Sequence, residues 1–241
     1  MKLSRILISG ANSQIGSFLA KYYSAKGHPM YLLYHHKDDR IREMEHPRQS
    51  VDLRDYAATS EAITNFGTPI DVLIHCAAIR SSDALPLAET DPAVFKSIFD
   101  GNMLPAYNIL RSVLPGMRNQ GFGRVVLFSS DITRTGLRNG SAYAAAKAAI
   151  ANLAKSASLE CIADNVLINC VAPGPVESIL EEDFSGDYLN FRKQYFQRHI
   201  ENSASHLLIT KAEISAAVDL LIDPRTSNLC GEEIFITGGK P

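Results

Sequence analysis

The sequence of 241 residues contains no long hydrophobic run and no excess of charge of one sign. No apolar stretch approaches the roughly 20 residues that a membrane-spanning helix requires. The beginning, MKLSRILISGANSQIG, turns polar after Ile8 and lacks the apolar region and cleavage site of a signal peptide. With 24 Lys and Arg against 26 Asp and Glu, the net charge is −2. This balance argues against nucleic acid or an anionic membrane as a main partner.

Cysteine is also scarce, and the chain lacks internal repeats, low-complexity segments and Pro/Ser-rich linkers. The four cysteines are far apart and form no CxxC pair: Cys76, Cys161, Cys170 and Cys230. This pattern favours buried thiols in a reducing cytoplasm over a disulfide framework or a metal site. The absence of linkers predicts a single domain over residues 1–241.

Two kinds of apolar segment alternate along the chain. Short runs suited to buried strands lie near residues 3–9, 30–34, 71–76, 124–128 and 166–171, and residues 51–53 resemble the end of another strand. Segments with helical spacing lie near residues 14–27, 55–66, 92–119, 141–162 and 211–222. Pro105 is expected to bend the third of these helices. The alternation predicts a parallel α/β sheet with right-handed crossovers and helices on both faces.

Residues 124–150 carry the side chains best suited to chemistry. Ser130 stands at the carboxyl end of a strand, where open α/β sheets bind ligands. The following Ala-rich helix places Tyr143 and Lys147 four residues apart on one face. A free tyrosine has a pKa of about 10, and a neighbouring cation lowers it. The three residues suit proton transfer to or from an oxygen, although a Tyr-x-x-x-Lys spacing alone occurs in many helices without any function.

The first turn, SGANSQIG, follows a strand and opens a helix. Gly10 and Gly16 allow the backbone to approach a phosphate, and the helix N-terminus supplies N–H groups and a positive dipole end. Many strand-to-helix turns carry glycine for geometry only, so a structural role is the alternative.

The second predicted strand ends in Tyr34 and is followed by His35, His36 and Lys37. A domain that prefers NAD usually has an acid here to bind the ribose 2′-hydroxyl, whereas His36 and Lys37 suit a 2′-phosphate. This favours NADP over NAD. The alternative is a solvated loop in which Asp38 and its neighbour partly cancel the cations.

Three further features point to a ligand or to packing. Cys76, Ala77 and Ala78 follow a strand, and their small side chains allow either a flat ring or a helix to approach closely. Asn102 lies inside a helix, where asparagine has poor propensity, so its side chain is expected to have a local role. Ser178 follows a Pro-Gly turn and suits either a helix cap or a ligand.

Together these motifs resemble the short-chain dehydrogenase/reductase family, and the likeness covers essentially the whole chain. The resemblance implies a Rossmann-type doubly wound parallel sheet of about seven strands. It also implies that Tyr143 is the general acid/base and that Lys147 lowers the pKa of Tyr143 and holds the nicotinamide ribose. Ser130 would orient the carbonyl, and Asn102 would anchor a water that relays protons to Lys147.

The resemblance further implies which residues bind the dinucleotide, and it implies no metal. These residues are Gly10, Asn12, Ser13, Gln14, Ile15, Gly16, His35, His36, Lys37, Asp52, Leu53, Cys76, Ala77, Ala78, Tyr143, Lys147, Pro173, Gly174, Val176 and Ser178.

The chain departs from the family in its first turn. Gln14 stands where the family has a glycine, so its side chain must point away from the pyrophosphate. Ser13 stands where many NADP-binding members have a basic residue. In the family, a segment like residues 178–205 forms a lid over the substrate, and here it is both aromatic and basic. Such a lid suits an aromatic or acidic substrate.

These features predict an NAD(P)-dependent oxidoreductase, NADP favoured, that interconverts a ketone and a secondary alcohol. Ketoacyl-carrier-protein reductases are similar in layout, so a 3-oxoacyl thioester is one candidate substrate. The basic residues that would meet an acidic carrier are replaced by Gly121 and Asp164, although Arg118 and Arg124 are near. A dinucleotide-binding regulator without activity is the alternative. The family implies a homo-oligomer, either a dimer or a tetramer.

Overall fold

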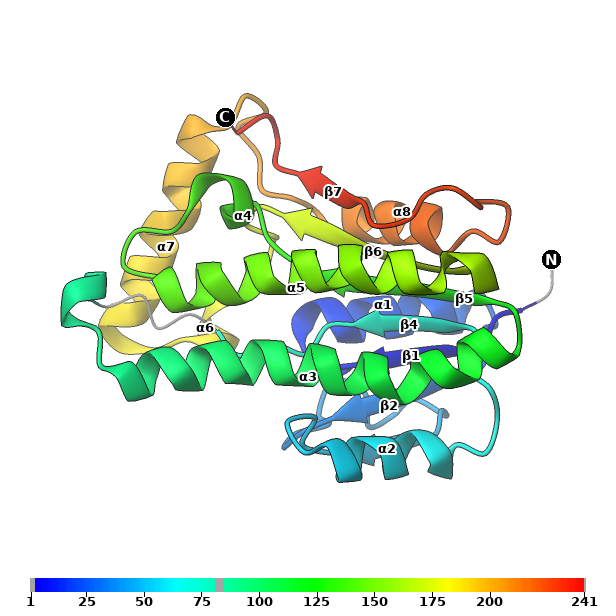
Figure 1. Ribbon diagram of the computed structural model, residues 1–241. Helices are drawn as coiled ribbons and strands as arrows, with labels where there is room; N and C mark the ends of the chain where they lie inside the picture. The colour runs from blue at the N-terminus through cyan, green and yellow to red at the C-terminus, as the bar shows by residue number, and fades with distance from the viewer. Residues whose placement is uncertain (1–2, 81–84, 241) are drawn as a thin grey trace.

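The computed structural model describes residues 3–80 and 85–240, and one parallel sheet of seven strands organises them (Figure 1). The strand order is β3-β2-β1-β4-β5-β6-β7. The strands are β1 (Ile6–Ser9), β2 (Met30–Tyr34), β3 (Arg48–Ser50), β4 (Val72–His75), β5 (Gly123–Phe128), β6 (Val166–Pro173) and β7 (Glu233–Ile236). The order reverses between β1 and β4, which creates the crevice where doubly wound folds bind ligands.

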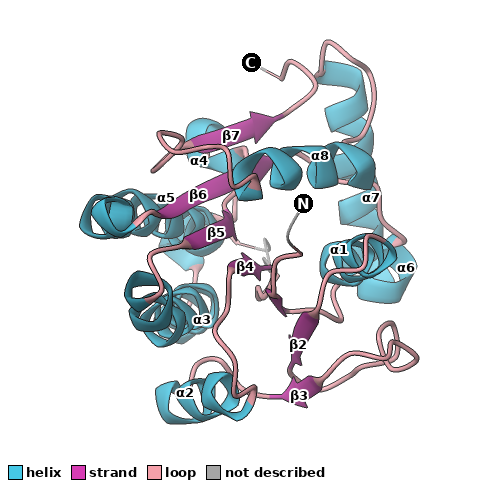
Figure 2. Cartoon of the chain, turned by 90° about the vertical axis from the view of Figure 1, so that its right-hand side faces the viewer, coloured by secondary structure: helices cyan, strands magenta, loops and turns pink. Residues whose placement is uncertain are grey.

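Helices cover both faces of the sheet, as Figure 2 shows. The helices are α1 (Gln14–Ala25), α2 (Tyr56–Asn65), α3 (Pro92–Asn119), α4 (Ile132–Thr135), α5 (Ser141–Cys161), α6 (Leu180–Asp183), α7 (Gly186–Asn202) and α8 (Lys211–Ile222). α2, α3 and α5 pack side by side on one face, and α1 packs against α8 on the other. The predicted Rossmann-type doubly wound sheet is confirmed.

Successive residues of the central strands face two separate cores. Leu7 of β1 packs with the α2, α3 and α5 side, whereas Ile6 and Ile8 pack with the α1 and α8 side. All three are fully buried. Burying one such side chain contributes about 1.5–3 kcal/mol, so central strands covered on both faces are continuously apolar.

The third strand differs from its predicted position. Residues 51–53 were expected to end it, but β3 is Arg48–Ser50 and precedes them. This edge strand pairs only with β2, so its polar residues stay accessible to solvent. Val51 and Leu53 lie beyond the strand and bury their side chains in the core beside α2 and α3. The apolar residues at 51–53 therefore indicated a segment that packs into the core after the strand, and not the strand itself.

Local signals explain several helix ends. Ser13 caps α1, Asp55 caps α2 and Asp91 caps α3, each by accepting a hydrogen bond from a backbone N–H. α3 continues through Pro105 without a break. The four cysteines are free, as predicted, although Cys76 and Cys230 are only half-buried.

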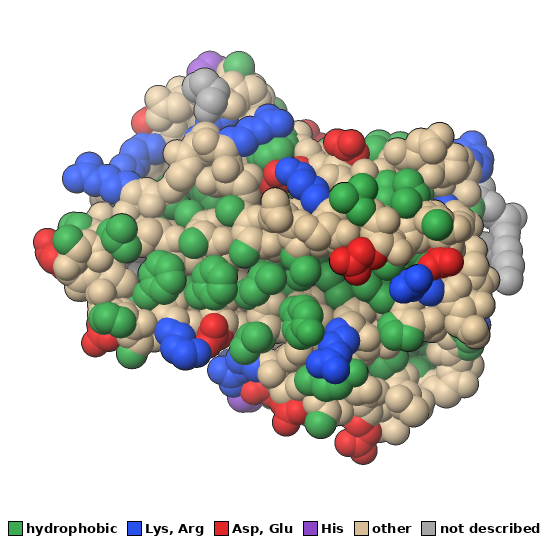
Figure 3. Space-filling view, viewed as in Figure 1, with side chains coloured by type: hydrophobic (Ala, Val, Ile, Leu, Met, Phe, Trp, Pro, Cys, Tyr) green, Lys and Arg blue, Asp and Glu red, His purple; other side chains and the backbone are tan. Residues whose placement is uncertain are grey.

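The surface over α3 and α5 carries a band of hydrophobic side chains (Figure 3). Its exposed members include Leu104 and Tyr107 of α3 and Leu159 of α5, which is 82% exposed. Among the helices of the described residues, none combines the length and apolarity needed to cross a bilayer.

Candidate active site

Two hollows open at the carboxyl ends of the strands. The first, here called the β5–α5 hollow, is bordered by Ser130, Tyr143, Lys147 and the segment from Pro173 to Ser178. The second, the β1–β2 hollow, is bordered by the first turn, the residues after β2, and Asp52 with Leu53. The two share five lining residues: Ser13, Cys76, Ala77, Ala78 and Arg80. One extended ligand can therefore occupy both.

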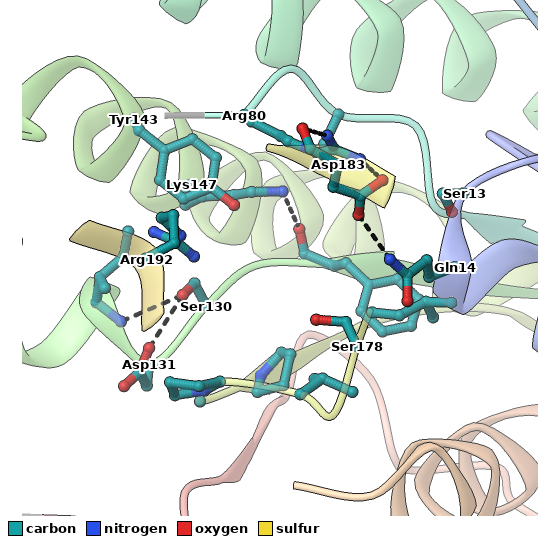
Figure 4. A pocket seen from close by; sticks show the side chains of 18 of the residues that line it. Ser13, Gln14, Arg80, Ser130, Asp131, Tyr143, Lys147, Ser178, Asp183 and Arg192 are labelled. Carbon is teal, nitrogen blue, oxygen red and sulfur yellow. Dashed lines mark hydrogen bonds and ion pairs between the residues drawn. The ribbon is translucent and has the colours of Figure 1, made fainter. Parts of the chain in front are cut away.

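The β5–α5 hollow brings together the three residues that sequence spacing singled out. Ser130 follows β5, while Tyr143 and Lys147 project from the first two turns of α5 (Figure 4). The Lys147 Nζ lies 5.5 Å from the centre of the Tyr143 ring. A cation this close stabilises the phenolate form of a tyrosine.

Lys147 is almost completely buried, with 4% of its surface exposed. Its Nζ donates a hydrogen bond to the Phe128 carbonyl oxygen at 2.9 Å. Burial lowers the pKa of Lys147 to about 8, because desolvation disfavours the ammonium form. The side chain therefore remains mostly protonated at neutral pH.

Ser130 has an acidic neighbour. Its hydroxyl donates to Asp131 Oδ1 at 3.1 Å, and the Ile132 N–H approaches Ser130 Oγ at 3.5 Å. Asp131 is 3% exposed, and its Oδ2 accepts a hydrogen bond from Lys240 Nζ at 2.8 Å. This end of the hollow thus contains a serine that is hydrogen-bonded to a carboxylate, which in turn pairs with a lysine.

Two glycines shape the first turn. Gly10 has φ +67°, and a β-carbon there would lie 2.4 Å from the Ala77 backbone nitrogen. A β-carbon on Gly16 would lie 2.3 Å from the Gly10 carbonyl oxygen. Only glycine fits either position. The glycines hold the turn against β4 and clear the N-terminus of α1 for an anion.

Gln14 reaches across the opening to the lid segment. Its Nε2 donates to the Ile179 carbonyl oxygen at 2.9 Å and to Asp183 Oδ2 at 2.8 Å. Its Oε1 accepts from the Ile179 N–H at 2.9 Å. Arg40 and Arg80 reinforce this connection through ion pairs with Asp183. The extra side chain in the first turn therefore fastens the turn to α6 (Figure 4).

Sequence and structure comparisons agree with this geometry. A family model of short chain dehydrogenases matches residues 4–188. The short-chain reductase protein NovJ of Streptomyces niveus is 33% identical over 189 residues, covering 77% of this chain and 69% of that protein. The 3-oxoacyl-acyl-carrier-protein reductase FabG of Vibrio harveyi is 28% identical over 191 residues, covering 78% and 74%. The crystal structure of levodione reductase has a TM-score of 0.87 and 25% identity, covering 99% and 98%.

The chain belongs to the short-chain dehydrogenase/reductase family. This dehydrogenase/reductase is an NAD(P)-dependent oxidoreductase, as the sequence predicted. The alternative was a dinucleotide-binding regulator without activity. Membership of this family and the similarity to reductases favour the enzyme instead.

The hollows of this dehydrogenase/reductase fit a nicotinamide dinucleotide. The glycine-shaped turn suits a pyrophosphate, and the wall of the β1–β2 hollow carries Lys37, Arg40 and Arg54 together with His35 and His36. Burial and the neighbouring His36 lower the pKa of His35, so that imidazole is neutral near pH 7. Arg54 pairs with Asp52 at 2.6 Å and holds the pKa of that carboxyl at about 2. Asp52 is therefore an ionised hydrogen-bond acceptor on the wall.

The acids after the cations have other partners. Asp38 pairs with Arg48 and Arg42, with closest distances of 3.3 Å and 3.6 Å. Asp39 accepts a hydrogen bond from Asn12 Nδ2 at 3.0 Å. Asp38 does not pair with His36 or Lys37 in any ion pair of the described residues. The charge of Lys37 helps to lower the pKa of Asp39, so the expected partial cancellation comes from Asp39.

Most of the predicted site residues border one of the two hollows of this dehydrogenase/reductase, but two do not. Gly16 instead packs under the first turn against Gly10. Asn102 is fully buried in α3, and its Nδ2 donates to the carbonyl oxygens of Ile79 and Ile98. Its Oδ1 has no hydrogen-bond partner among the described residues.

The capping role considered for Ser178 is wrong, because α6 begins at Leu180 and its N-cap residue is Ile179. Ser178 borders the β5–α5 hollow instead. Sequence reasoning also missed Arg80, Asp131 and Lys240. Arg80 lies two residues after Ala78, and Asp131 directly follows Ser130. Lys240 gave no sequence signal, because its partner Asp131 is 109 residues away in the chain.

The segment predicted as a lid forms α6 and α7, and it is aromatic and basic as expected. Phe184, Arg192, Tyr195 and Phe196 border the β5–α5 hollow. The Arg192 guanidinium carbon lies 5.0 Å from the centre of the Tyr195 ring. The lid therefore contributes rings and a cation to the wall of the hollow.

The two arginines considered for an acidic carrier both have partners, Arg124 inside the protein and Arg118 at its surface. Arg124 is 1% exposed and donates to carbonyl oxygens of Gly123, Asn165 and Thr226. Arg118 pairs with Asp164 at 2.6 Å. The Arg118 side chain is 52% exposed, so its carboxylate partner offsets its charge at the surface, whereas Arg124 is not accessible.

Proposed function

We propose that this dehydrogenase/reductase reduces a 3-oxoacyl thioester to the 3-hydroxyacyl thioester and uses NADPH in preference to NADH. The observation that carries the proposal is the meeting of Ser130, Tyr143 and the buried Lys147 on the wall of one hollow. When bound, the reduced nicotinamide supplies the hydride that is transferred to the carbonyl carbon.

Tyr143 then supplies the proton. Its phenol donates to the substrate oxygen as the hydride arrives at carbon, so that the carbonyl becomes a secondary alcohol and the tyrosine becomes a phenolate. The ammonium of Lys147 stabilises that phenolate, since burial weakens competing solvation by water. Ser130 hydrogen-bonds the substrate oxygen and holds the carbonyl in place.

The Tyr143 phenolate is proposed to regain its proton from solvent through Lys147 and a water that Asn102 holds. The Asn102 amide nitrogen is already committed to Ile79 and Ile98, which fixes the orientation of the side chain. The buried Oδ1 then remains to hold a water that connects to Lys147. In this role Asn102 acts through Lys147 and is a positioning residue.

The preference for NADPH is supported by the wall of the β1–β2 hollow. His36 and Lys37 follow β2, where an NAD-binding domain usually has an acid. Asp38 pairs with Arg48 and Arg42, and Asp39 offsets only part of the charge of Lys37, so these two basic side chains suit a ribose 2′-phosphate.

The substrate class is supported by the FabG relative, which is named as a 3-oxoacyl-acyl-carrier-protein reductase. Delivery by a carrier protein has less support, because Arg124 is buried and the exposed Arg118 is paired with Asp164. We therefore propose a small thioester such as acetoacetyl-CoA as the test substrate, with residues 178–205 as its lid.

The test compares the wild type with Tyr143→Phe. The variant keeps the ring and loses the acidic proton, so reduction of acetoacetyl-CoA should fall by about a thousandfold or more. Fluorescence titration should show that NADPH affinity stays within about twofold and exceeds NADH affinity by about tenfold in both proteins. Unchanged turnover would remove Tyr143 from the mechanism. Equal affinities would refute the preference, and no turnover by the wild type would refute the substrate class.

A further inference from the structure

The carboxylate of Asp131 lies between the catalytic serine and the end of the chain. Asp131 Oδ1 accepts the Ser130 hydroxyl at 3.1 Å, and Oδ2 accepts the Lys240 ammonium at 2.8 Å. The carboxylate is 3% exposed, whereas the Lys240 side chain is 25% exposed. A buried carboxylate requires hydrogen bonds and a nearby positive charge. Here Ser130 donates to one oxygen, and Lys240 donates to the other and supplies the charge.

Lys240 is the cation that balances this carboxylate. Two other basic side chains lie nearby. Arg192 of α7 borders the same hollow as Ser130 and Asp131 (Figure 4). His199 of α7 lies close as well: a β-carbon on Gly174 would lie 3.0 Å from His199 Cε1 and 3.7 Å from Asp131 Oδ2. Burial lowers the pKa of His199, and Lys240 lowers it further against the opposing effect of Asp131. His199 is therefore neutral near pH 7, and it has no hydrogen bond to Asp131 among the described residues.

The carboxylate limits what Ser130 can offer a substrate. A hydroxyl carries one proton and two acceptor positions. While Ser130 donates that proton to Asp131, its oxygen can only accept a hydrogen bond. An alcohol can donate to it, but a ketone oxygen has no proton and needs Ser130 as the donor. Lys240 shares the charge of the carboxylate, which weakens the acceptor and eases the release of the serine proton.

We propose that Asp131 and Lys240 form a positioning pair that decides whether Ser130 donates a hydrogen bond to the substrate oxygen or accepts one from it. The pair acts through Ser130 and does not itself touch the reacting atoms. This inference rests on the proposed function, since it requires the oxygen of a ketone or an alcohol beside Ser130.

Binding constants test the pair better than rates do. A mutation leaves the equilibrium constant of the reaction unchanged, so it cannot favour one direction in kcat/KM while cofactor binding stays the same. Two complexes that cannot react show directly whether Ser130 donates or accepts a hydrogen bond. They are acetoacetyl-CoA with the enzyme and NADP+, and 3-hydroxybutyryl-CoA with the enzyme and NADPH. Calorimetric titration of each gives the affinity for the ketone and for the alcohol separately.

Lys240→Met leaves the carboxylate as a stronger acceptor for Ser130. The ketone should bind about five- to tenfold more weakly, the effect of one hydrogen bond, and the alcohol should bind as before. Asp131→Asn weakens the acceptor, so the alcohol should lose affinity by a few fold while the ketone does not. The double variant should behave like Asp131→Asn, because Lys240 acts through Asp131. Lys21→Met, at an exposed lysine of α1, is the control and should change neither affinity.

Two results would overturn the pair. One is a change of both affinities by the same factor in Lys240→Met, which would indicate a general structural role. The other is a loss of ketone affinity on Lys240→Met that is just as large when Asp131 is already replaced by asparagine. If Asp131→Asn does not fold, Lys240→Met alone decides, because its site is partly exposed. If the wild type does not reduce acetoacetyl-CoA with either dinucleotide, the proposed substrate class fails and this inference fails with it.

Discussion

Lys147 combines its proposed catalytic role with a cost to folding. The ammonium is buried, and its pKa is lowered from the ordinary value of 10.5 to about 8. Below pH 8 the folded and unfolded chains both carry the proton, and the folded state bears the full desolvation penalty. Between about pH 8 and 10.5 the unfolded chain keeps a proton that the folded chain has lost. The residue therefore favours the folded state increasingly as pH rises through this window.

Lys147→Met should remove this pH dependence. The free energy of unfolding of the wild type, relative to the variant, should rise by roughly 1.4 kcal/mol per pH unit between about pH 8 and 10. Urea unfolding of the cofactor-free proteins across this range measures the difference. Lys21→Met controls for ordinary lysine titration, and parallel pH curves for the wild type and Lys147→Met would contradict the expectation.

Residue-level chemistry was predictable only where neighbours in sequence are neighbours in space. Tyr143 and Lys147 share a helical face because of their four-residue spacing, and Ser130 was located by the strand that precedes it. The contact between Asp131 and Lys240 joins positions 109 residues apart, and no local pattern signals it. The buried state of Arg124 was likewise hidden, because its partners belong to three separate segments.

At the scale of elements, the segment predicted as a lid is tied to the first turn. Gln14 makes three hydrogen bonds to Ile179 and Asp183, although 165 or more residues separate them in sequence. A dinucleotide that spans the two hollows has to pass this bridge. Opening of α6 is therefore expected to limit how fast the cofactor leaves.

Gln14→Gly restores the glycine usual in the family and removes the bridge. NADPH should dissociate about three- to tenfold faster, since two or three modest hydrogen bonds no longer hold the lid. Stopped-flow displacement of bound NADPH measures this rate. Gln194→Ala, at an exposed position of α7, should leave it unchanged. Slower or equal release from Gln14→Gly would show that the bridge does not restrain the cofactor.

The limits of helices with a strong apolar periodicity were predicted closely, whereas the position of the polar edge strand β3 was not. The predicted limits of α3 and α8 agree with the structure, because both helices bury a regular apolar face and α8 begins with a capping box at Thr210. β3 was misplaced because an edge strand of polar residues has no apolar alternation. The lid over residues 178–205 stays a prediction, and the attachment of this segment through Gln14 depends on folding that no local sequence reveals.

At the scale of the molecule, the hydrophobic band over α3 and α5 is the surface best suited to self-association (Figure 3). Exposed apolar side chains gathered on two adjacent helices mark an interaction surface rather than scattered surface residues. We expect a dimer or tetramer in which this band packs against the same band of a second copy.

Tyr107→Glu combined with Leu159→Glu should break that assembly. Two carboxylates buried in an apolar interface are strongly unfavourable, so the double variant should elute as a protomer of 26.4 kDa. Light scattering after size-exclusion chromatography gives the mass. Leu3→Glu, at an exposed leucine outside the band, is the matched control. An assembly that survives the double change would place the interface elsewhere.

The contact of Gly10 with the Ala77 backbone has a consequence for binding entropy. Since the two chain segments touch with no side chain between them, the anion-facing amides are braced by the central strands before any ligand arrives. The protein then loses little conformational freedom when the pyrophosphate binds, and more of the interaction free energy appears as affinity. Rigidity that comes from the sheet is thus expected to offset the loss of the glycine that the family usually has at Gln14.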